Sequence, residues 1–326
     1  MDATIELIGE VIKHPDADRL DIVKIMGFQC ITQTGLYTQG TKIIYIRPDS
    51  LLPIEMWTEE YRKYSPKRVK SCKLRGMWSE GIIVPFELLP NGNDLKDLEV
   101  GTDVSALIGV THYVAPEPQD VNAKGGLPYG IPKTDEDRWE SERRLPFGEL
   151  CDVLLKVDGQ SSSFFYELME KYFGILGRSL ELHEMFTNKY TAHIARYDIK
   201  NKLIKFCEEN NVSLCIRGES YGSGIQGNEN NPHAKLEPAF AMFSVYNITK
   251  REYERKGSEF YFLNIADKLD IPTVEVIERD VVLTQELIDK YSTGITKLNG
   301  KAFEGVVIQH SKGSFKVINK DYDSKK

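Results

Sequence analysis

One lysine in this sequence has the surroundings of a nucleophile. Lys156-Val157-Asp158-Gly159 follows directly after the apolar run at 151–155, which places the lysine at the end of a buried strand. An amine can attack phosphorus only when it is neutral, whereas the pKa of an unperturbed lysine is about 10.4. We expect neighbouring cations and desolvation to bring it to about 7 or 8, which requires on the order of 4 kcal/mol. An exposed lysine before an Asp-Gly turn is the common alternative.

Charged residues also end or follow three predicted strands downstream. They lie in the segments Ile216-Arg217-Gly218-Glu219, Glu304-Gly305-Val306 and Ser314-Phe315-Lys316. Hard divalent cations such as Mg²⁺ prefer carboxylate oxygens or the waters that these hold, and we expect such a metal ion at Asp158, Glu219 and Glu304. Lys316 would lie at the α-phosphate of a nucleotide, where its charge stabilises a pentavalent transition state and helps to keep the nucleophile neutral.

The order of these segments resembles the motif series of the covalent nucleotidyltransferases, the superfamily of nucleic-acid ligases and capping enzymes. The resemblance covers roughly residues 127 to 326, in the segments 156–159, 216–219, 243–246, 304–308 and 314–318. It implies an enzyme that uses ATP with Mg²⁺ or Mn²⁺. Lys156 would attack ATP and release pyrophosphate, AMP would pass to a 5′-phosphate, and a 3′-hydroxyl would then displace AMP.

The resemblance also assigns the nucleotide contacts, which would come from Lys156, Arg178, Glu219, Phe243, Glu304 and Lys316. Phe243 offers a flat apolar face for adenine, with a plain core residue as the alternative. Arg178 matches a family position that contacts the ribose or the terminal 5′-phosphate, with a surface charge as the alternative.

The last motif departs from the family pattern. Two lysines separated by one residue are usual there, but Ile318 stands in the second place. Lys320 is our candidate for the missing catalytic charge, with a solvated lysine near a frayed 320–326 tail as the alternative. The role of a second lysine therefore stays open at this point.

The half of the chain that carries these residues mixes helical and strand patterns. Strands are predicted at 151–157, 212–219, 240–248, 303–310 and 314–318, and helices at 164–177, 193–211 and 284–295. We expect an α+β adenylyltransferase domain over residues 127–326, with antiparallel sheets and helices in an ATP-grasp-like arrangement. Residues 114–126, rich in Pro and Gly, predict a linker.

The first part of the chain predicts a small, mostly antiparallel barrel. Runs rich in β-branched residues at 4–14, 20–27, 41–48 and 79–89 are bounded by Gly and Pro, and an OB-like barrel over residues 1–113 is the natural candidate. Ile8–Leu20 and Lys73–Ile82 resemble the opening and closing segments of OB-fold tRNA-binding modules.

The position of this module bears on the type of enzyme. An OB module N-terminal to the transferase resembles the type 5 RNA ligases, whereas DNA ligases and capping enzymes carry theirs C-terminally. Lys326 comes ten residues after Lys316, and we expect no further domain there.

A basic run at residues 62–75 contains no acid. In an acidic protein it is the best candidate for a surface that follows nucleic-acid phosphates, with a solvated face as the alternative. The proposed nucleic-acid-binding residues are Lys63, Lys67, Arg68, Lys70, Lys73 and Arg75.

The composition of the chain limits which classes of protein it can belong to. At 326 residues with 41% hydrophobic residues, the chain can form two packed domains. A net charge of −7 argues against nonspecific coating of nucleic acid. No secretory signal or membrane-spanning run is present, and the odd number of widely spaced cysteines (Cys30, Cys72, Cys151, Cys207 and Cys215) suits a reducing cytoplasm.

These observations lead to an ATP-dependent RNA ligase as the first hypothesis, acting as a monomer on RNA ends or nicked duplexes, with no membrane partner. A DNA ligase or a GTP-dependent capping guanylyltransferase is the alternative within enzymes. A noncatalytic RNA-binding OB protein is the alternative outside them, although an intact lysine, three carboxylates and Lys316 oppose a degenerate transferase half.

Overall fold

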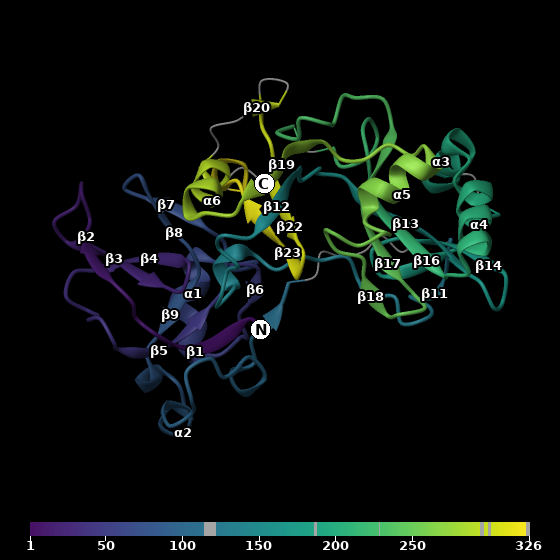
Figure 1. Cartoon of the computed structure of the whole chain (residues 1–326). Helices are drawn as coiled ribbons and strands as arrows, with labels where there is room; N and C mark the ends of the chain where they lie inside the picture. The colour runs from purple at the N-terminus through teal and green to yellow at the C-terminus, as the bar shows by residue number, and fades with distance from the viewer. Residues whose placement is uncertain (114–121, 186–187, 228, 294–296, 299–300, 324–326) are drawn as a thin grey trace. The chain divides into compact units, whose positions relative to one another are not determined.

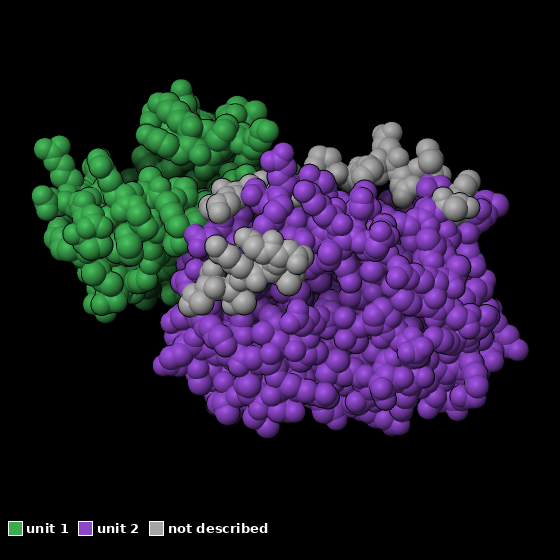
Figure 2. Space-filling model, turned by 90° about the horizontal axis from the view of Figure 1, so that it is seen from above, with its two compact units in different colours: residues 1–117, 139–144 green, residues 118–138, 145–326 purple. Residues whose placement is uncertain are grey.

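A computed structural model describes residues 1–113, 122–185, 188–227, 229–293, 297–298 and 301–323. The chain divides into two compact units, coloured separately in Figure 2. Unit 1 comprises Met1–Glu117 with Trp139–Arg144, and unit 2 comprises Pro118–Arg138 with Leu145–Lys326.

Unit 1 consists of short antiparallel strands and short helices (Figure 1). One sheet has the order β1 (Ala3–Leu7), β5 (Lys42–Ile46), β9 (Ile82–Val84), and another has the order β2 (Val11–Lys13), β3 (Leu20–Ile25), β4 (Phe28–Gln33). Two further pairs are β6 (Ser50–Leu51) with β10 (Thr111–His112), and β7 (Cys72–Leu74) with β8 (Met77–Ser79). The helical segments are η1 (Met56–Thr58), α1 (Glu59–Tyr64), η2 (Phe86–Leu88), α2 (Gly92–Lys96), η3 (Ala106–Ile108) and η4 (Trp139–Ser141).

Strand β5 shows why these residues form a core on both faces of the sheet. Successive side chains of a strand point to opposite faces, and Ile44 and Ile46 join one buried cluster while Ile43 and Tyr45 join another. The hydroxyl of Tyr45 donates a hydrogen bond to the carbonyl of Glu80 at 2.8 Å, which satisfies its polar end inside the core. The predicted antiparallel, barrel-like module is confirmed.

Unit 2 is built on a seven-stranded antiparallel sheet. Its order is β11 (Ala123–Gly126), β15 (Leu180–Leu182), β14 (Tyr172–Leu176), β13 (Gln160–Glu167), β16 (Leu214–Tyr221), β17 (Ala239–Asn247), β18 (Glu252–Tyr253). The helices of this part are α3 (Lys189–Tyr197), α4 (Ile199–Asn210) and α5 (Phe262–Leu269), of which α4 packs on β13 and α5 on β17.

A four-stranded sheet completes unit 2 and carries the candidate nucleophile. Its order is β19 (Val276–Val282), β12 (Leu150–Leu155), β22 (Gly305–His310), β23 (Gly313–Ile318). Helix α6 (Gln285–Ser292) packs on β22 and β23, while β20 (Lys297–Leu298) pairs with β21 (Lys301–Ala302) and α7 (Lys320–Asp323) follows β23. The expected α+β domain of antiparallel sheets with helices is confirmed.

The helix predicted over 164–177 is wrong, because this segment forms the hairpin of β13 and β14. The periodicity misled because both faces of these strands are covered, so that Phe164, Phe165 and Tyr166 are buried in succession. Gly174 accommodates the Phe165 ring, since a Cβ at this position would lie 2.2 Å from a ring carbon.

Two segments differ from the domain boundaries that the sequence suggests. Ala123–Gly126, expected in the linker, forms β11 and pairs with β15; residues 114–121 lie outside the described residues. Trp139–Arg144, expected in the second domain, belongs to unit 1, where the amide of Gly27 donates to the carbonyl of Glu140 at 3.3 Å. The low content of apolar residues predicted a linker. An edge strand, however, pairs its backbone amides and carbonyls with one neighbouring strand and can do so with few apolar side chains.

Two further findings concern the whole described chain. All five cysteines are free thiols, and only Cys72 is exposed. Within the described ranges, no helix has the length and apolar character needed to cross a membrane.

His193 in α3 makes the stability of unit 2 depend on pH. It is buried against Phe240 and Tyr197, and burial, with Arg196 and Lys189 nearby, lowers its pKa from 6.5 to about 4. Between pH 6.5 and pH 4 this histidine is protonated in the unfolded chain but stays neutral in the folded chain. Acidification over this range therefore lowers the free energy of unfolding by about 3 kcal/mol. Denaturant unfolding of wild type and His193→Phe at pH 7 and pH 4.5 checks this. The variant should lose less stability on acidification, and equal losses would contradict the assignment.

Candidate active site

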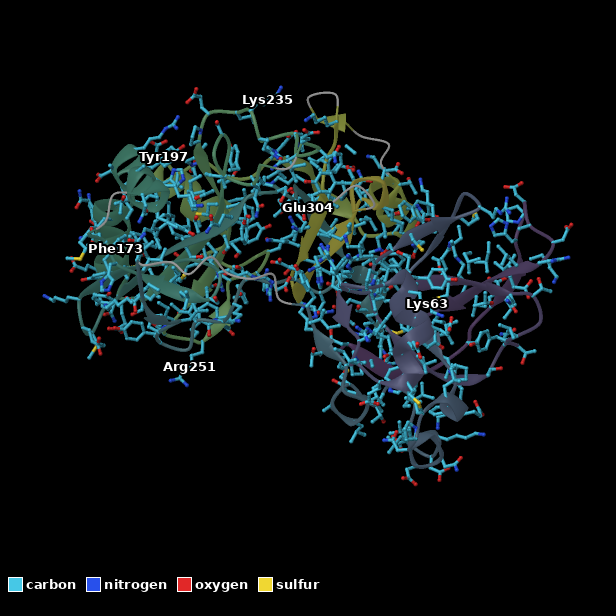
Figure 3. The ribbon with its side chains drawn as sticks, turned by 180° about the vertical axis from the view of Figure 1, so that it is seen from behind. Lys63, Phe173, Tyr197, Lys235, Arg251 and Glu304 are labelled. Atoms are coloured by element: carbon cyan, nitrogen blue, oxygen red, sulfur yellow. The ribbon has the colours of Figure 1, made fainter. Side chains whose placement is uncertain are left out.

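Lys156 lies where two neighbouring strands bring their motifs together. Strand β12 pairs with β22 in a register that sets Leu155 opposite Val306, and the amide of Lys156 donates to the carbonyl of Gly305 at 2.9 Å. The Nζ of Lys156 donates to Oε2 of Glu304 at 2.9 Å, and Glu304 is labelled in Figure 3. Two predicted site residues separated by 148 positions are therefore in direct contact.

A glycine after Glu304 is needed for this contact. Gly305 has a φ of +142°, and a Cβ there would lie 2.2 Å from the carbonyl oxygen of Val317. Only glycine adopts such a conformation without strain. The Glu-Gly pair of this motif thus follows from the close approach of β22 and β23.

The charge around Lys156 differs from the sequence expectation. Burial alone would lower the pKa of Lys156, but the carboxylates of Glu304, Glu219 and Glu136 raise it above the ordinary lysine range. The sequence expectation named a bound divalent cation and Lys316 as the positive charges beside this amine, whereas the described side chains that act most strongly on it are acids. The amine forms one half of an ion pair with Glu304.

Glu219, near the end of β16, faces the same centre. Burial, reinforced by Glu304, Asp158 and Glu136 and opposed by Lys156, raises the pKa of Glu219 to about 8. Gly159 gives it room, since a Cβ on this glycine would lie 2.8 Å from Cγ of Glu219 and 2.3 Å from the carbonyl oxygen of Ser220. Gly159, the glycine of the lysine motif, is therefore needed because β16 packs directly against it.

Asp158 is buried and tied to two residues that the sequence did not single out. Its carboxylate accepts a hydrogen bond from the hydroxyl of Tyr322 in α7, and its carbonyl accepts from Nδ2 of Asn231 at 2.8 Å. Tyr322 is 1% exposed, so the expectation of a frayed tail from residue 320 is wrong up to this tyrosine; residues 324–326 lie outside the described residues. Nothing local in the sequence marks either partner.

These carboxylates suit a hard divalent cation by their chemistry. Their mutual effect on the pKa of Glu219 shows an excess of negative charge that a cation would balance. Among the described residues, however, no three His, Cys, Asp or Glu side chains form a ready-made metal cluster. The structure brings Glu219 and Glu304 to Lys156, while the Asp158 carboxylate is held by Tyr322.

Lys316 and Arg178, two of the predicted nucleotide contacts, share the carboxylate of Asp135. Nζ of Lys316 in β23 donates to Oδ1 of Asp135 at 2.9 Å, and Nη2 of Arg178 donates to its Oδ2 at 3.3 Å. Sequence reasoning missed Asp135. Lys320, the candidate for the second lysine, is the first residue of α7, and its catalytic role stays a prediction.

Phe243 lies at an irregularity of β17. The register between β16 and β17 shifts from Arg217 opposite Ser244 to Gly218 opposite Met242, so Phe243 is the extra residue of a bulge. It is half-buried, and its carbonyl accepts from Nε2 of Gln309 at 2.9 Å.

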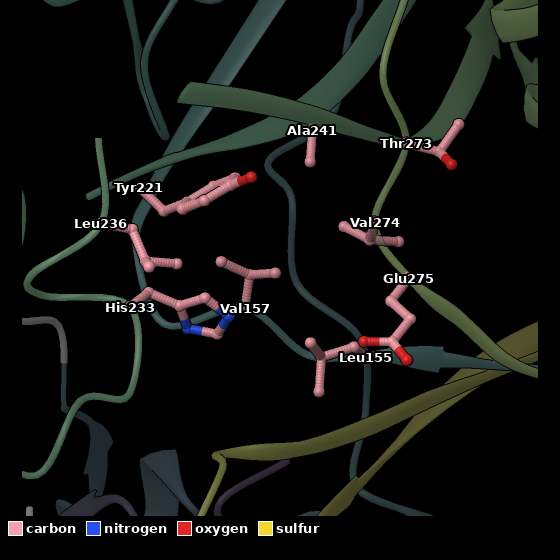
Figure 4. Close-up of a pocket in the computed structure, with 9 residues that line it drawn as sticks. All are labelled: Leu155, Val157, Tyr221, His233, Leu236, Ala241, Thr273, Val274 and Glu275. Carbon is pink, nitrogen blue, oxygen red and sulfur yellow. The ribbon is translucent and has the colours of Figure 1, made fainter. Parts of the chain in front are cut away.

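A cavity of about 390 Å³ lies beside the chain neighbours of Lys156 (Figure 4). Leu155 and Val157, the neighbours of Lys156 in the chain, line it together with Ala241, Tyr221, His233 and Glu275. His233 is 4% exposed, and no described group makes a hydrogen bond to its Nδ1. This nitrogen is a buried polar atom that a ligand can satisfy.

The basic run lies in unit 1, on α1, the following loop and the β7–β8 hairpin. Three of its members are already engaged: Lys63 (labelled in Figure 3) pairs with Glu60, Arg68 pairs with Asp49 at 2.8 Å, and Lys73 lies over the Trp78 ring at 4.6 Å. Lys67, Lys70 and Arg75 are exposed, and no described acidic side chain pairs with them. These three form the free part of the run.

Comparison with known proteins points in one direction. A family model described as RNA ligase matches residues 153–321, slightly more than half of the chain, and an OB-fold domain model matches residues 2–86. No curated protein sequence matches the chain.

Solved structures of a Naegleria gruberi RNA ligase are similar over the whole chain. A variant with ATP and Mn has 25% identity and a TM-score of 0.84, covering 100% of this chain and 99% of that one. The same ligase with pyrophosphate has 25% identity and a TM-score of 0.82, covering 98% and 97%. A variant with AMP and Mn has 24% identity and a TM-score of 0.83, covering 100% and 98%.

Proposed function

Since the chain belongs to the RNA ligase family, we propose that it joins 3′-hydroxyl and 5′-phosphate RNA ends, at nicks in duplexes, through an AMP carried on Lys156. The contact of Lys156 Nζ with Glu304, at the meeting of β12 and β22, is the observation that carries this proposal. It gives one half-buried amine a fixed position among carboxylates.

Three phosphoryl transfers would follow one another at this amine. In the first, Nζ of Lys156 attacks the α-phosphorus of ATP, a phosphorus–nitrogen bond forms, pyrophosphate leaves and the amine loses its proton. In the second, a 5′-phosphate oxygen displaces Lys156 from the AMP phosphorus. In the third, a 3′-hydroxyl attacks the 5′-phosphorus of the RNA and AMP leaves with the bonding electrons.

Residues of this chain would hold and orient the nucleotide. Lys316 and Arg178 would meet its phosphates, since guanidinium and ammonium groups donate charge-assisted hydrogen bonds to phosphate oxygens. Phe243 is the proposed stacking face for adenine, and the cavity in Figure 4 adds apolar walls and the unpaired His233 nitrogen.

The proposed metal ligands are Asp158, Glu219 and Glu304. When bound, Mg²⁺ or Mn²⁺ would supply positive charge that offsets these acids and the charge developing on the phosphate. The carboxyl of Asp158 is kept in place by the hydroxyl of Tyr322. Lys320 is the proposed second lysine of the last motif.

The surface formed by Lys67, Lys70 and Arg75, with Lys63, Arg68 and Lys73 beside it, is the proposed RNA-binding surface. Exposed cations without an acidic partner contribute most to phosphate binding, because no existing ion pair has to be broken. Tyr64, 87% exposed in the same run, adds a ring on which a base can stack. Unit 1 would bind the RNA strand that supplies the 3′-hydroxyl. We expect the protein to act as a monomer.

The test is a ligation panel of nicked RNA, DNA and mixed duplexes with ATP or GTP. We expect a nick with ribose at its 3′-hydroxyl end to be sealed with ATP, and an all-DNA nick poorly. Replacing Lys67, Lys70 and Arg75 by Ala should weaken sealing by roughly tenfold or more at 150 mM salt, and leave self-adenylylation without RNA unchanged. Equal sealing of RNA and DNA nicks, or labelling from GTP alone, would overturn the RNA ligase assignment.

A further inference from the structure

Asp135 lies between the two cations that the proposed function assigns to phosphate. Each of its carboxylate oxygens accepts from one of them, Oδ1 from Lys316 and Oδ2 from Arg178. We propose that Asp135 occupies the place of a substrate phosphate in the free protein, and that ATP binds by displacing it. This inference rests on the proposed function.

The backbone on either side fixes where this carboxylate lies. The carbonyl of Pro132 accepts from Nη2 of Arg217 at 2.7 Å, and Arg217 is itself 1% exposed. The carbonyl of Asp137 accepts from the amide of Lys316 at 2.8 Å. Asp135 is therefore carried by a segment anchored at both ends, one of them on the strand that bears Lys316.

The charge and exposure of Asp135 allow it to form ion pairs with Lys316 and Arg178 that a phosphate can displace. Although burial alone would raise it, Lys316 and Arg178 hold the pKa of Asp135 below its usual range, so the group is an anion at neutral pH. Its side chain is 46% exposed, that of Arg178 is 45% exposed and that of Lys316 is 20% exposed. Ion pairs open to water are weak, so the pair with Arg178 is the weaker of the two. A phosphate has more acceptor oxygens and more negative charge than one carboxylate, so it competes well for the same donors.

Two consequences follow for the reaction. The carboxylate keeps Lys316 and Arg178 close to each other before nucleotide arrives, and it lowers the affinity of the site for any phosphate by competing with it. Asp135 is thus a positioning residue that lowers the affinity for nucleotide. Its removal should therefore strengthen nucleotide binding. A residue with a merely structural role would weaken binding when removed.

The experiment compares AMP binding by calorimetry in wild type, Asp135→Asn and Asp137→Asn, using the full chain with Mg²⁺ after treatment with pyrophosphate to remove any bound adenylate. Asp137 is the matched control, because it lies on the same segment, is exposed, and its loss changes net charge equally. We expect Asp135→Asn to bind AMP roughly threefold to tenfold more tightly, and Asp137→Asn to bind like wild type. Adenosine, which has no phosphate, should bind all three proteins equally.

Salt gives a second readout. The gain of Asp135→Asn should shrink as ionic strength rises, since screening weakens both the internal pairs and the contact with phosphate. Unchanged or weaker AMP binding by Asp135→Asn, or an equal gain with Asp137→Asn, would overturn the inference while wild type still labels Lys156 with AMP. A wild type that acquires no AMP would instead overturn the proposed function itself.

Discussion

Lys156→Ala should lose covalent labelling by α-labelled ATP down to background, and Lys156→Arg should lose it equally. Alanine has no nucleophile, and the guanidinium of arginine keeps its charge at every accessible pH. The pair separates the need for a neutral amine from the need for a positive charge beside Glu304. A denaturing gel after incubation with labelled ATP and Mg²⁺ or Mn²⁺ measures the outcome, with ligation of a nicked RNA duplex as the second assay.

Lys205→Ala is the matched control for this lysine. Lys205 lies on α4, is 76% exposed and forms only a loose pair with Glu209 at 3.8 Å, so its loss should change neither labelling nor stability appreciably. Persistent label in Lys156→Ala would mean that another residue carries the nucleotide. Equal thermal unfolding of the variants and wild type would show that the fold is intact.

Glu304→Gln should reduce self-adenylylation by about a hundredfold or more. Two effects oppose each other here. Loss of the carboxylate lets the pKa of Lys156 fall, which favours the neutral amine, but it also removes a proposed ligand for the divalent cation. Because the cation stabilises charge on the phosphate in the transition state, we expect the second effect to dominate.

The dependence on metal concentration distinguishes these two effects. In Glu304→Gln, the concentration of Mg²⁺ or Mn²⁺ that gives half-maximal labelling should rise, whereas Glu209→Gln, an exposed control on α4, should behave like wild type. Faster labelling in Glu304→Gln would show instead that the ion pair with Lys156 restrains the reaction and that Glu304 holds no metal.

The sequence predicts the meeting of three candidate residues where each is marked by its own strand. Lys156 directly follows β12, Glu219 lies near the end of β16 beside Gly218, and Glu304 directly precedes β22 beside Gly305. Antiparallel pairing of β12 with β22 then brings the end of one strand to the start of the other. The strand pattern is local, because it depends only on alternation and on nearby turn residues. Their meeting around one amine therefore follows from elements that can be predicted one at a time.

Other features depend on contacts that no local pattern records. Asp135 reaches Lys316 across 181 positions, and no motif in the sequence singles out its segment. The hairpin at 160–176 was predicted as a helix because both faces of β13 are covered, which removes the alternation that identifies a strand. Likewise, the sign of the charge around Lys156 is set by the convergence of acids from three segments, at Glu304, Glu219 and Glu136, and composition alone does not give it.

The hydrogen bond from Tyr322 to Asp158 spans 164 positions and has a consequence for biosynthesis. A growing chain that has just emerged with its lysine motif lacks the partner that orients the aspartate beside it. The ribosome must add α7 before this part of the centre can be assembled. A recombinant version cut after β23 would lack the same hydrogen bond.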